Sequence, residues 1–305
     1  MRVLREVAVR GSFSAAAESL SFTQSAVSQQ IAALERETGA TLVERSARGV
    51  RLTDAGRALV KHTEAILARL TEAESELEAI AGLRGGRVRM AAFESACATL
   101  MPPAIAEYRS RHPAVELSMT LSEPEASLPQ LRAGEIELAV IFGGALAESY
   151  SIEGLELFPL MEDPLYLVLP ADHPLARKRN IRLADLAHEP WIGGPVDCEC
   201  TALIRRSCAV AGYDPRIAFE IDDYGAVQGL VAAGVGVSLI AEMGLSSVRE
   251  DIVVRSLGRD APVRRVHAAV HDGGYRSPAT AAMLDVLREV GERLAARRPE
   301  LELVG

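Results

Sequence analysis

The sequence lacks several features that would place it in other classes of protein. Aromatic residues make up only 4% of the 305 residues, and lysine occurs only twice. No run of about 18 apolar residues exists, so the chain is not expected to cross a membrane. The first residues are amphipathic and charged, without the apolar centre of a secretion signal, so we expect a cytoplasmic protein. Because aromatics are scarce, aliphatic packing must supply the core.

Cysteine is also rare, and so are the signatures of catalysis. The spacing of the four cysteines does not match paired C-x2-C motifs, which argues against a structural zinc site. None of the six histidines lies in a nucleophile elbow or an H-E-x-x-H motif. We therefore expect no metal, no cofactor and no enzyme activity, and a reducing compartment should keep the cysteines as thiols.

Charge is distributed unevenly along the chain. The net charge of −9 would repel DNA, but residues 1–62 hold nine basic and six acidic residues, a net charge of +3. The remaining 24 basic and 36 acidic residues give −12. This asymmetry is typical of a small nucleic-acid-binding domain attached to an acidic body.

The amino-terminal window contains the most specific pattern. It predicts three short helices, over residues 3–9, 15–20 and 24–38. Ser14 is the expected N-cap of the second helix and Thr23 of the third, which Gly39 ends. Two short helices joined by a tight turn are how a small domain presents one helix to the DNA major groove.

The third helix has two distinct faces. Its apolar positions are Val27, Ile31 and Leu34, which define the face toward the core. The opposite side and its flanks carry small or hydrogen-bonding residues, namely Gln24, Ser25, Ser28, Gln29, Ala32 and Arg36. Such a surface suits a groove better than a solvated helix face, which would more often carry Glu and Lys.

A basic hairpin is expected next, with strands at residues 42–45 and 50–52 around a turn. Arg45, Arg48 and Arg51 crowd this wing. They suit contacts to phosphates, although Arg51 could instead pair with Glu44 across the hairpin.

A long helix then runs from Thr53, its cap, to about residue 81. Two series of residues recur at heptad spacing over about three heptads and form a seam that is apolar except at Thr63. They are Leu59, Ile66, Ala73 and Ile80, and Thr63, Leu70 and Leu77. We expect this seam to pair with the same helix of a second chain, and the alternative is packing against its own domain. Residues 82–86 are expected to form a flexible hinge.

Strand and helix patterns alternate from residue 87 to the end. Strands are expected at residues 88–92, 115–121, 138–142, 165–169, 191–193, 218–221, 235–240 and 263–270, and helices at residues 98–111, 128–133, 201–211, 226–233 and 278–297. This alternation indicates parallel α/β layers in two lobes joined by crossing strands, with a cleft between them.

At this point the chain resembles the LysR-type transcriptional regulators over nearly its whole length. The resemblance is carried by FSAAAESL at residues 13–20, TQSAVSQQIAALE at 23–35, LVERSARGVRLTDAGRALV at 42–60 and LVAAGVGVSLI at 230–240. It implies an α/β multidomain protein with a winged helix-turn-helix at residues 1–58 and a linker or dimerisation helix and hinge at 59–86. A two-lobed, periplasmic-binding-protein-like effector domain would follow at 87–305, with lobe I at about 87–160 and 263–305 and lobe II at about 161–262.

The resemblance also implies partners and site residues. Expected partners are double-stranded promoter DNA, a small-molecule effector, a second copy or three further copies of the chain, and RNA polymerase as a further candidate. Hydrogen-bonding side chains of the third helix and its cap, Thr23, Gln24, Ser25, Ser28 and Gln29, would meet base edges. The guanidinium groups of Arg36, Arg45, Arg48 and Arg51 would hold phosphates.

The effector would lie between the lobes. We expect Ser95, Gly193, Gly194 and Tyr224 to line that cleft, although Ser95 could instead be an ordinary helix N-cap. Glu94, Asp222 and Asp223 would make the cleft acidic, so the effector could be less anionic than the carboxylates that many relatives bind.

One alternative keeps the fold but changes the signal. A thiol-based redox sensor would use Cys198, Cys200 or Cys208, with Arg205 and Arg206 lowering the pKa of a nearby thiol. Cys200 and Cys208 are eight residues apart, a spacing only loosely similar to that of peroxide-sensing relatives. On one helix, however, they lie about 12 Å apart, beyond the roughly 7 Å that a disulfide tolerates. A solute-binding protein is opposed by the DNA-binding pattern.

Overall fold

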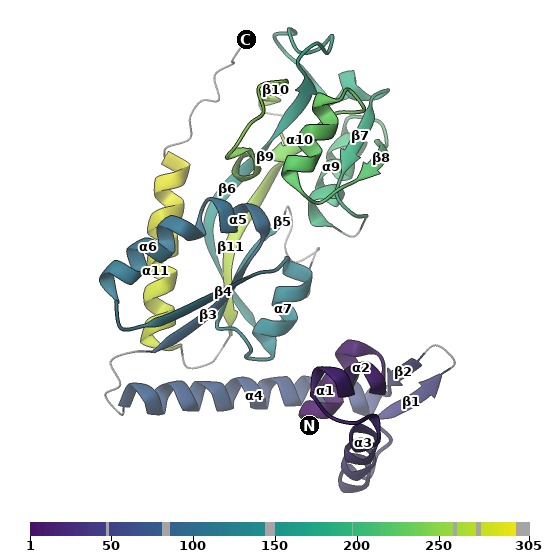
Figure 1. Ribbon diagram of the computed structural model, residues 1–305, viewed down its shortest axis with the longest axis vertical. Coiled ribbons are helices and arrows are strands. Elements are labelled where there is room, and N and C mark those ends of the chain that lie inside the picture. The colour runs from purple at the N-terminus through teal and green to yellow at the C-terminus, as the bar shows by residue number, and fades with distance from the viewer. Residues whose placement is uncertain are drawn as a thin grey trace. The chain divides into compact units, whose positions relative to one another are not determined.

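Figure 1 shows a computed structural model of the chain, which describes residues 1–46, 49–80, 86–143, 150–196, 198–258, 261–272 and 276–296. The chain divides into two compact units. The first comprises Met1–Gly82 with Arg132–Glu135, and the second comprises Leu83–Leu131 with Ile136–Gly305. Within the described ranges, no helix has the length and apolarity needed to span a membrane.

The first unit is a winged helix-turn-helix followed by a long helix. Its elements are α1 (Arg2–Arg10), α2 (Phe13–Ser19), α3 (Gln24–Thr38), β1 (Val43–Ser46), β2 (Gly49–Leu52) and α4 (Asp54–Ile80). Strands β1 and β2 pair as an antiparallel hairpin. One apolar face of each short helix packs into a common core that includes Leu4, Val7, Ala16, Val27, Ile31 and Leu42.

Local capping sets where these helices begin and end. Thr23 accepts a hydrogen bond from the Ala26 N–H at 3.2 Å, and Gly39 ends α3 in the left-handed conformation with a φ of 66°, so both predictions are confirmed. The predicted cap at Ser14 is wrong. Ser12 caps α2 instead, accepting from the Ala15 N–H at 3.1 Å. The helix begins earlier because Phe13, its first residue, is buried in the core.

Helices α3 and α4 both contact the wing. The carboxylate of Glu35 on α3 accepts hydrogen bonds from the N–H groups of Leu42 and Val43, at 2.8 and 3.2 Å. Gly56 on α4 lies so close to the same segment that an added Cβ would be 2.1 Å from the Leu42 carbonyl oxygen. The orientation of the wing is therefore determined by α3 and α4 together.

Helix α4 starts as predicted and then leaves the core. Thr53 accepts a hydrogen bond from the Gly56 N–H at 3.0 Å, as expected of its N-cap. Leu59 contacts the head and Thr63 is buried. Further along the heptad seam, Ile66 and Leu70 are 54% and 50% exposed. The seam thus leaves large apolar side chains uncovered in the single chain.

The second unit is built on a mixed seven-stranded sheet. Its order is β10-β6-β11-β5-β3-β4, with β9 also paired to β6. In the first lobe β3 (Arg87–Ala92) pairs in parallel with β4 (Glu116–Leu121) and β5 (Leu138–Gly143). The long β6 (Leu155–Pro170) and β11 (Val263–His271) are antiparallel, as are the pairings of β6 with β9 (Ser238–Ala241) and β10 (Ile252–Arg255). The expected layers are therefore not parallel throughout, because the long β6 and β11 run antiparallel to their neighbours.

Helices cover both faces of the first-lobe sheet. On one face α6 (Met101–Arg111) packs beside α11 (Pro278–Ala296), as Figure 1 shows, over a core that includes Met90 and Val266. On the other face α7 (Pro124–Arg132) buries Leu128 and Leu131. The helix predicted at residues 98–111 begins at Met101, and the short α5 (Glu94–Ala98) that precedes it was not predicted.

The second lobe surrounds a core that contains the single tryptophan, Trp191. Strands β7 (Pro190–Gly193) and β8 (Arg216–Glu220) pair in parallel, and α9 (Glu199–Val210) and α10 (Tyr224–Ala232) connect the strands. Short 3-10 turns, η1 (Leu183–Leu186) and η2 (Glu242–Leu245), complete it. The amino-terminal ends of α5, α9 and α10 all reach one cavity.

Candidate functional site

The outer surface of α3 carries the residues predicted to read DNA. Gln24, Ser25, Gln29 and Arg36 are exposed, and Ser28 is half-buried at the flank. Val27 and Ile31 face the core, so the amphipathic pattern oriented the helix as expected. Thr23 is exposed, but its oxygen is already used as the cap of α3 and contacts the Ser25 hydroxyl at 3.0 Å.

The wing is described only in part. Arg51 lies on β2 with an exposed side chain, directly opposite Glu44 in the hairpin register. Arg45 lies on β1. Arg48 falls outside the described residues, so its predicted phosphate contact stays a prediction.

The second unit encloses a cavity between its two lobes, with about 50 Å³ of space open to water-sized molecules. All four residues predicted to line the cleft are found on its wall, namely Ser95, Gly193, Gly194 and Tyr224. The first belongs to α5 of the first lobe, and the other three belong to the second lobe. A Cβ at Gly194 would meet the Thr201 hydroxyl at 3.2 Å, so glycine leaves room for α9 at this point.

Arg264 of β11 is the centre of this cavity, and the sequence analysis did not single it out. Its guanidinium is 1% exposed and donates to the Asp163 carboxylate on β6 at 2.8 Å. It also donates to the Ser95 hydroxyl at 2.6 Å and to the Tyr224 hydroxyl at 3.3 Å. The rings of Phe93 and Phe142 flank it at 4.9 and 4.6 Å. One buried cation therefore contacts both lobes at once.

A pattern in the sequence could have identified Arg264 and Asp163 as a buried pair. The two residues are direct partners in the β6–β11 register. Arg264 lies on the same face of β11 as the buried Val266 and Ala268, and Asp163 lies on the same face of β6 as the buried Leu165. A charged residue on the buried phase of a strand needs a partner, because an isolated buried charge is very costly.

Carboxylates surround the mouth of the cavity. Glu94, Glu123 and Asp222 all contribute to its lining. Burial raises the pKa of Glu123 to about 7, and the neighbouring Asp222 also raises it. Burial raises the pKa of Glu94 as well, and Asp223 and Asp222 add to this effect. The predicted acidic character of the cleft is therefore present in the structure.

The start of α5 differs from the expectation. Its N-cap is Phe93, so Ser95 lies inside the helix, and the interpretation of Ser95 as an ordinary N-cap is wrong. The N–H group of Glu94 donates to the Glu123 carboxylate at 3.3 Å. The chain thus places one of its own carboxyl groups at the amino-terminal end of α5.

Two of the four cysteines also line the cavity. Cys198 is the N-cap residue of α9, and Cys200 follows in its first turn. The Cys200 sulfur accepts a hydrogen bond from the Arg264 guanidinium at 3.5 Å. By contrast, Cys208 is buried on the same helix and donates to the Tyr213 hydroxyl at 3.3 Å.

The arginines expected to act on these thiols pair elsewhere. Arg206 forms an ion pair with Glu199 at 2.6 Å, and Arg205 with Asp214 at 2.8 Å. The arginine beside Cys200 is Arg264, which comes from a strand more than 60 residues away in the sequence.

A winged helix-turn-helix joined through a long helix to a two-lobed domain with a polar cavity defines a ligand-responsive, DNA-binding transcriptional regulator. The chain belongs to the LysR family. Residues 1–57 match the bacterial regulatory helix-turn-helix protein, lysR family, and residues 81–292 match the LysR substrate binding domain. Members of this family are regulators and not enzymes, so the chain is assigned to transcription regulation.

Individual relatives agree with this assignment. The chain is 30% identical over 298 residues to the probable HTH-type transcriptional regulator LrrA of Synechococcus elongatus, covering 97% of this chain and 98% of the relative. Full-length BenM has the same fold, with a TM-score of 0.61, 23% identity and 98% of each chain covered. Full-length CbnR in complex with its target DNA has a TM-score of 0.56 at 24% identity, covering 95% of this chain and 98% of CbnR.

Proposed function

We propose that a small molecule in the inter-lobe cavity regulates how this protein acts at its promoter. The observation that carries the proposal is Arg264, whose hydrogen bonds reach Ser95 in one lobe and Tyr224 in the other. A ligand that replaces one of these bonds changes the relative stability of two lobe arrangements. Such a difference in affinity between two states is what a ligand needs to shift an equilibrium.

The proposed DNA contacts divide into two groups. Gln24, Ser25, Ser28 and Gln29 on α3, with Thr23 at its cap, supply amides and hydroxyls that both donate and accept, as base edges require. The guanidinium groups of Arg36, Arg45, Arg48 and Arg51 supply phosphate contacts that position the head without reading sequence. The exposure of α3 and of Arg51 supports this division.

The cavity lining favours a neutral or cationic effector. Its one cation, Arg264, is already paired with Asp163, whereas Glu94, Glu123 and Asp222 crowd together. An added carboxylate would face these like charges in a poorly solvated space, where repulsion is strong. An amine would relieve the crowding. The small volume means that the lobes must separate for anything larger than a few atoms.

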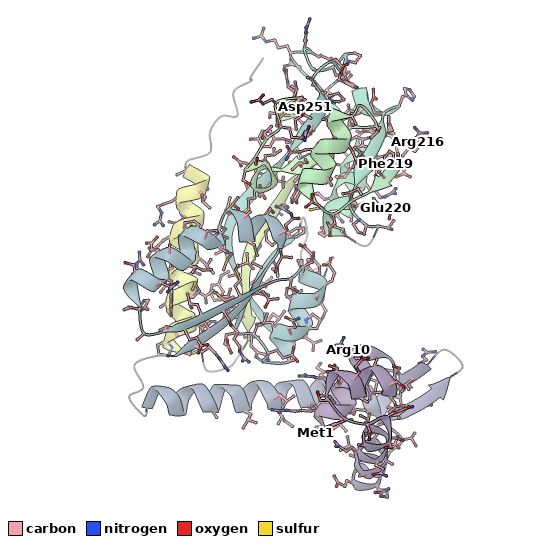
Figure 2. All side chains as sticks on the ribbon, in the orientation of Figure 1. Met1, Arg10, Arg216, Phe219, Glu220 and Asp251 are labelled. Carbon is pink, nitrogen blue, oxygen red and sulfur yellow. The ribbon has the colours of Figure 1, made fainter. Side chains whose placement is uncertain are left out.

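We further propose self-association through α4. The exposed Ile66 and Leu70 lie on its heptad seam, and pairing of two such seams buries them. Further apolar side chains are exposed on the effector domain, namely Met119 and Leu121 on the edge strand β4 and Phe219 on β8. Figure 2 shows Arg216, Phe219 and Glu220 along β8. One surface gives a homodimer, and both together allow a homotetramer.

The effector proposal is tested by calorimetric titration of the full-length protein with matched small molecules. Sets that share a carbon skeleton and differ only in an amino, hydroxyl or carboxyl group separate charge from shape. The amine should bind most tightly, and Glu123→Gln should weaken it. Preferential binding of the carboxylate, unchanged by Glu123→Gln, would contradict the proposed class of ligand.

A further inference from the structure

A second cavity of the effector domain lies beside the inter-lobe cavity and shares part of its wall. It is bounded by α5 of the first lobe, by the start of α10, and by η2 with the segment that follows it. Its volume is about 260 Å³, against about 50 Å³ for the inter-lobe cavity. Glu94, Ser95 and Tyr224 line both, whereas Gln228 and Arg249 line only this second one, which we call the η2 cavity.

A buried amide fixes the outer rim of the η2 cavity. Gln228 of α10 is 3% exposed, and its Nε2 donates to the Ser247 carbonyl at 2.9 Å. Its Oε1 accepts a hydrogen bond from the Arg249 N–H at 3.1 Å. Because both polar ends of one buried side chain bind the same exposed segment, Arg249 reaches the cavity from a fixed backbone position.

The Arg249 guanidinium is oriented on one side and open on the other. Asp251, labelled in Figure 2, accepts hydrogen bonds from its Nε at 2.8 Å and from one terminal nitrogen, Nη2, at 2.7 Å. The other terminal nitrogen, Nη1, has no partner among the described residues. Since a guanidinium carries five N–H groups, Arg249 keeps donors for a second carboxylate while it stays paired with Asp251.

The first lobe supplies a carboxylate to the same cavity. Within the part of the chain that the structure describes, the Glu94 side chain makes no hydrogen bond and no ion pair with a cation. Burial raises its pKa, and the carboxylates of Asp223 and Asp222 add to this effect. An ammonium group of a ligand would offset this repulsion and favour the charged form of Glu94.

The chemistry of the lining identifies a class of ligand. Among the described residues, Arg249 and Glu94 are the charged members of the wall, and Ala98 and Met243 add apolar side chains. An α-amino acid carries a carboxylate, an ammonium group and a side chain, one for each of these features. At about 30 Å³ per water molecule, the cavity volume corresponds to about nine non-hydrogen atoms, which is the size of leucine.

Hydrogen bonds connect the η2 cavity to the buried ion pair of Arg264 and Asp163. Arg264 donates to the hydroxyls of Ser95 and Tyr224, which line both cavities. The Met243 N–H donates to the Asp163 carboxylate at 3.1 Å. A molecule that moves η2 or the Tyr224 ring therefore acts on the residues that join the two lobes.

We propose that the η2 cavity is a second ligand site, which takes a zwitterionic α-amino acid with an aliphatic side chain. Nη1 of Arg249 binds the carboxylate, Glu94 binds the ammonium group, and Ala98 and Met243 contact the side chain. Because Glu94 also borders the inter-lobe cavity, an ammonium group bound here lowers the affinity of that cavity for an amine, and the effect is reciprocal. The binding stands on the η2 cavity alone, whereas this coupling rests on the proposed effector site.

The binding is tested by calorimetric titration of the full-length protein with leucine as the probe. Arg249→Gln should weaken leucine binding at least about tenfold, because a charge-assisted hydrogen bond is lost. Arg205→Gln is the matched control, since Arg205 also forms an exposed ion pair, with Asp214, and lines neither cavity. Isocaproate, which is leucine without its amino group, should bind at least about tenfold more weakly. Hydrogen exchange in η2 and at the start of α10 should slow when leucine is bound.

Ethylamine is the probe for the inter-lobe cavity. Glu123→Gln should weaken ethylamine binding and leave leucine binding unchanged, because Glu123 lines the inter-lobe cavity and not the η2 cavity. A saturating concentration of leucine should weaken ethylamine binding about fivefold.

The outcomes separate the second site from the proposed effector site. Leucine binding that is absent, or that survives Arg249→Gln unchanged, would overturn the second site, and so would an equal loss in Arg205→Gln. If leucine binds as expected and ethylamine does not bind, the proposed class of effector fails and the second site stands. Ethylamine that binds equally with and without leucine rejects the coupling.

Discussion

At the scale of single residues, the two parts of the molecule use polar groups in opposite ways. On α3 the amides and hydroxyls are exposed, where they can exchange water for base edges. In the cavity the polar groups are buried and already bonded to each other around Arg264. The exposed groups of α3 can bind DNA by forming new hydrogen bonds. The buried groups of the cavity can respond to a ligand only when it replaces a hydrogen bond that they already make.

The division between base-reading and phosphate-binding residues predicts different effects of two substitutions. Gln29→Ala should cost about 1–3 kcal/mol on the cognate site and little on unrelated DNA, because a base contact is lost. Arg51→Ala should weaken binding to both and lower the slope of log affinity against log salt by about one. Gel-shift titrations at several salt concentrations measure both effects. The reverse ranking would contradict the assignment of these residues.

The raised pKa of Glu123 predicts that the stability of the protein depends on pH. Its pKa is about 7 in the folded protein, against 4.5 for an ordinary glutamate, so between these values the folded state holds a proton that the unfolded state has released. The free energy of unfolding should therefore fall as pH rises from about 4.5 to about 7. Glu123→Gln should remove this loss, on the order of 3 kcal/mol at pH 8 and near zero at pH 4.

Urea unfolding followed by Trp191 fluorescence measures this effect in the second unit alone, because Trp191 is the only tryptophan. Glu116→Gln, on an exposed position of β4, is the matched control and should not change the pH profile. Parallel pH profiles for the Glu123→Gln and unsubstituted proteins would show that Glu123 keeps an ordinary pKa.

At the scale of helices and strands, local signals were predictable from the sequence and long-range ones were not. Thr23, Gly39 and Thr53 delimit helices through contacts within a few residues, and the structure confirms all three. The first half of β6 was not predicted, because Pro159 and Pro164 interrupt its pattern. The sheet accommodates Pro159 at a register shift opposite Val266 and His267.

The candidate site shows the same limit. Ser95, Gly193, Gly194 and Tyr224 could be predicted because each follows or begins an element next to the cleft. Arg264 and Asp163 were missed, since they are 101 residues apart and meet only through the pairing of β6 with β11. The sequence predicts which face of each strand is buried, but it does not identify the strand with which each one pairs.

The close approach of α4 to the wing predicts that replacing a helical glycine with alanine destabilises the head, although this change usually stabilises a helix. Gly56→Ala would normally stabilise a helix, but here the Cβ would clash with the Leu42 carbonyl. We expect a loss of about 1–3 kcal/mol in the head, seen as faster hydrogen exchange of α1 to α3 amides. Gly229→Ala on α10, where nothing lies within 4 Å, should instead stabilise by up to about 1 kcal/mol. Equal effects at both positions would contradict the close approach.

At the scale of the whole molecule, the self-association that we propose through α4 would set the spacing of two DNA-reading heads. Ile66→Asp places a charge in the proposed seam and should shift the protein toward monomer. The substitution should therefore reduce the affinity for a promoter with two half-sites more than the affinity for a single half-site. Lys61→Glu, on the opposite side of α4, should leave the mass unchanged. Light scattering on the size-exclusion peak gives the mass directly. A retained oligomer in Ile66→Asp would exclude α4 as the main contact.

The position of Arg264 on a crossing strand has a consequence for sensor engineering. Its ion pair with Asp163 joins two neighbouring strands of one sheet, so it survives any rotation that keeps those strands together. The carboxylates at the mouth, by contrast, come from helix starts and loops, which can be exchanged without disturbing the sheet. Retargeting this regulator to a new inducer should therefore begin with Glu94, Glu123 and Asp222, with the central pair kept as a fixed pivot.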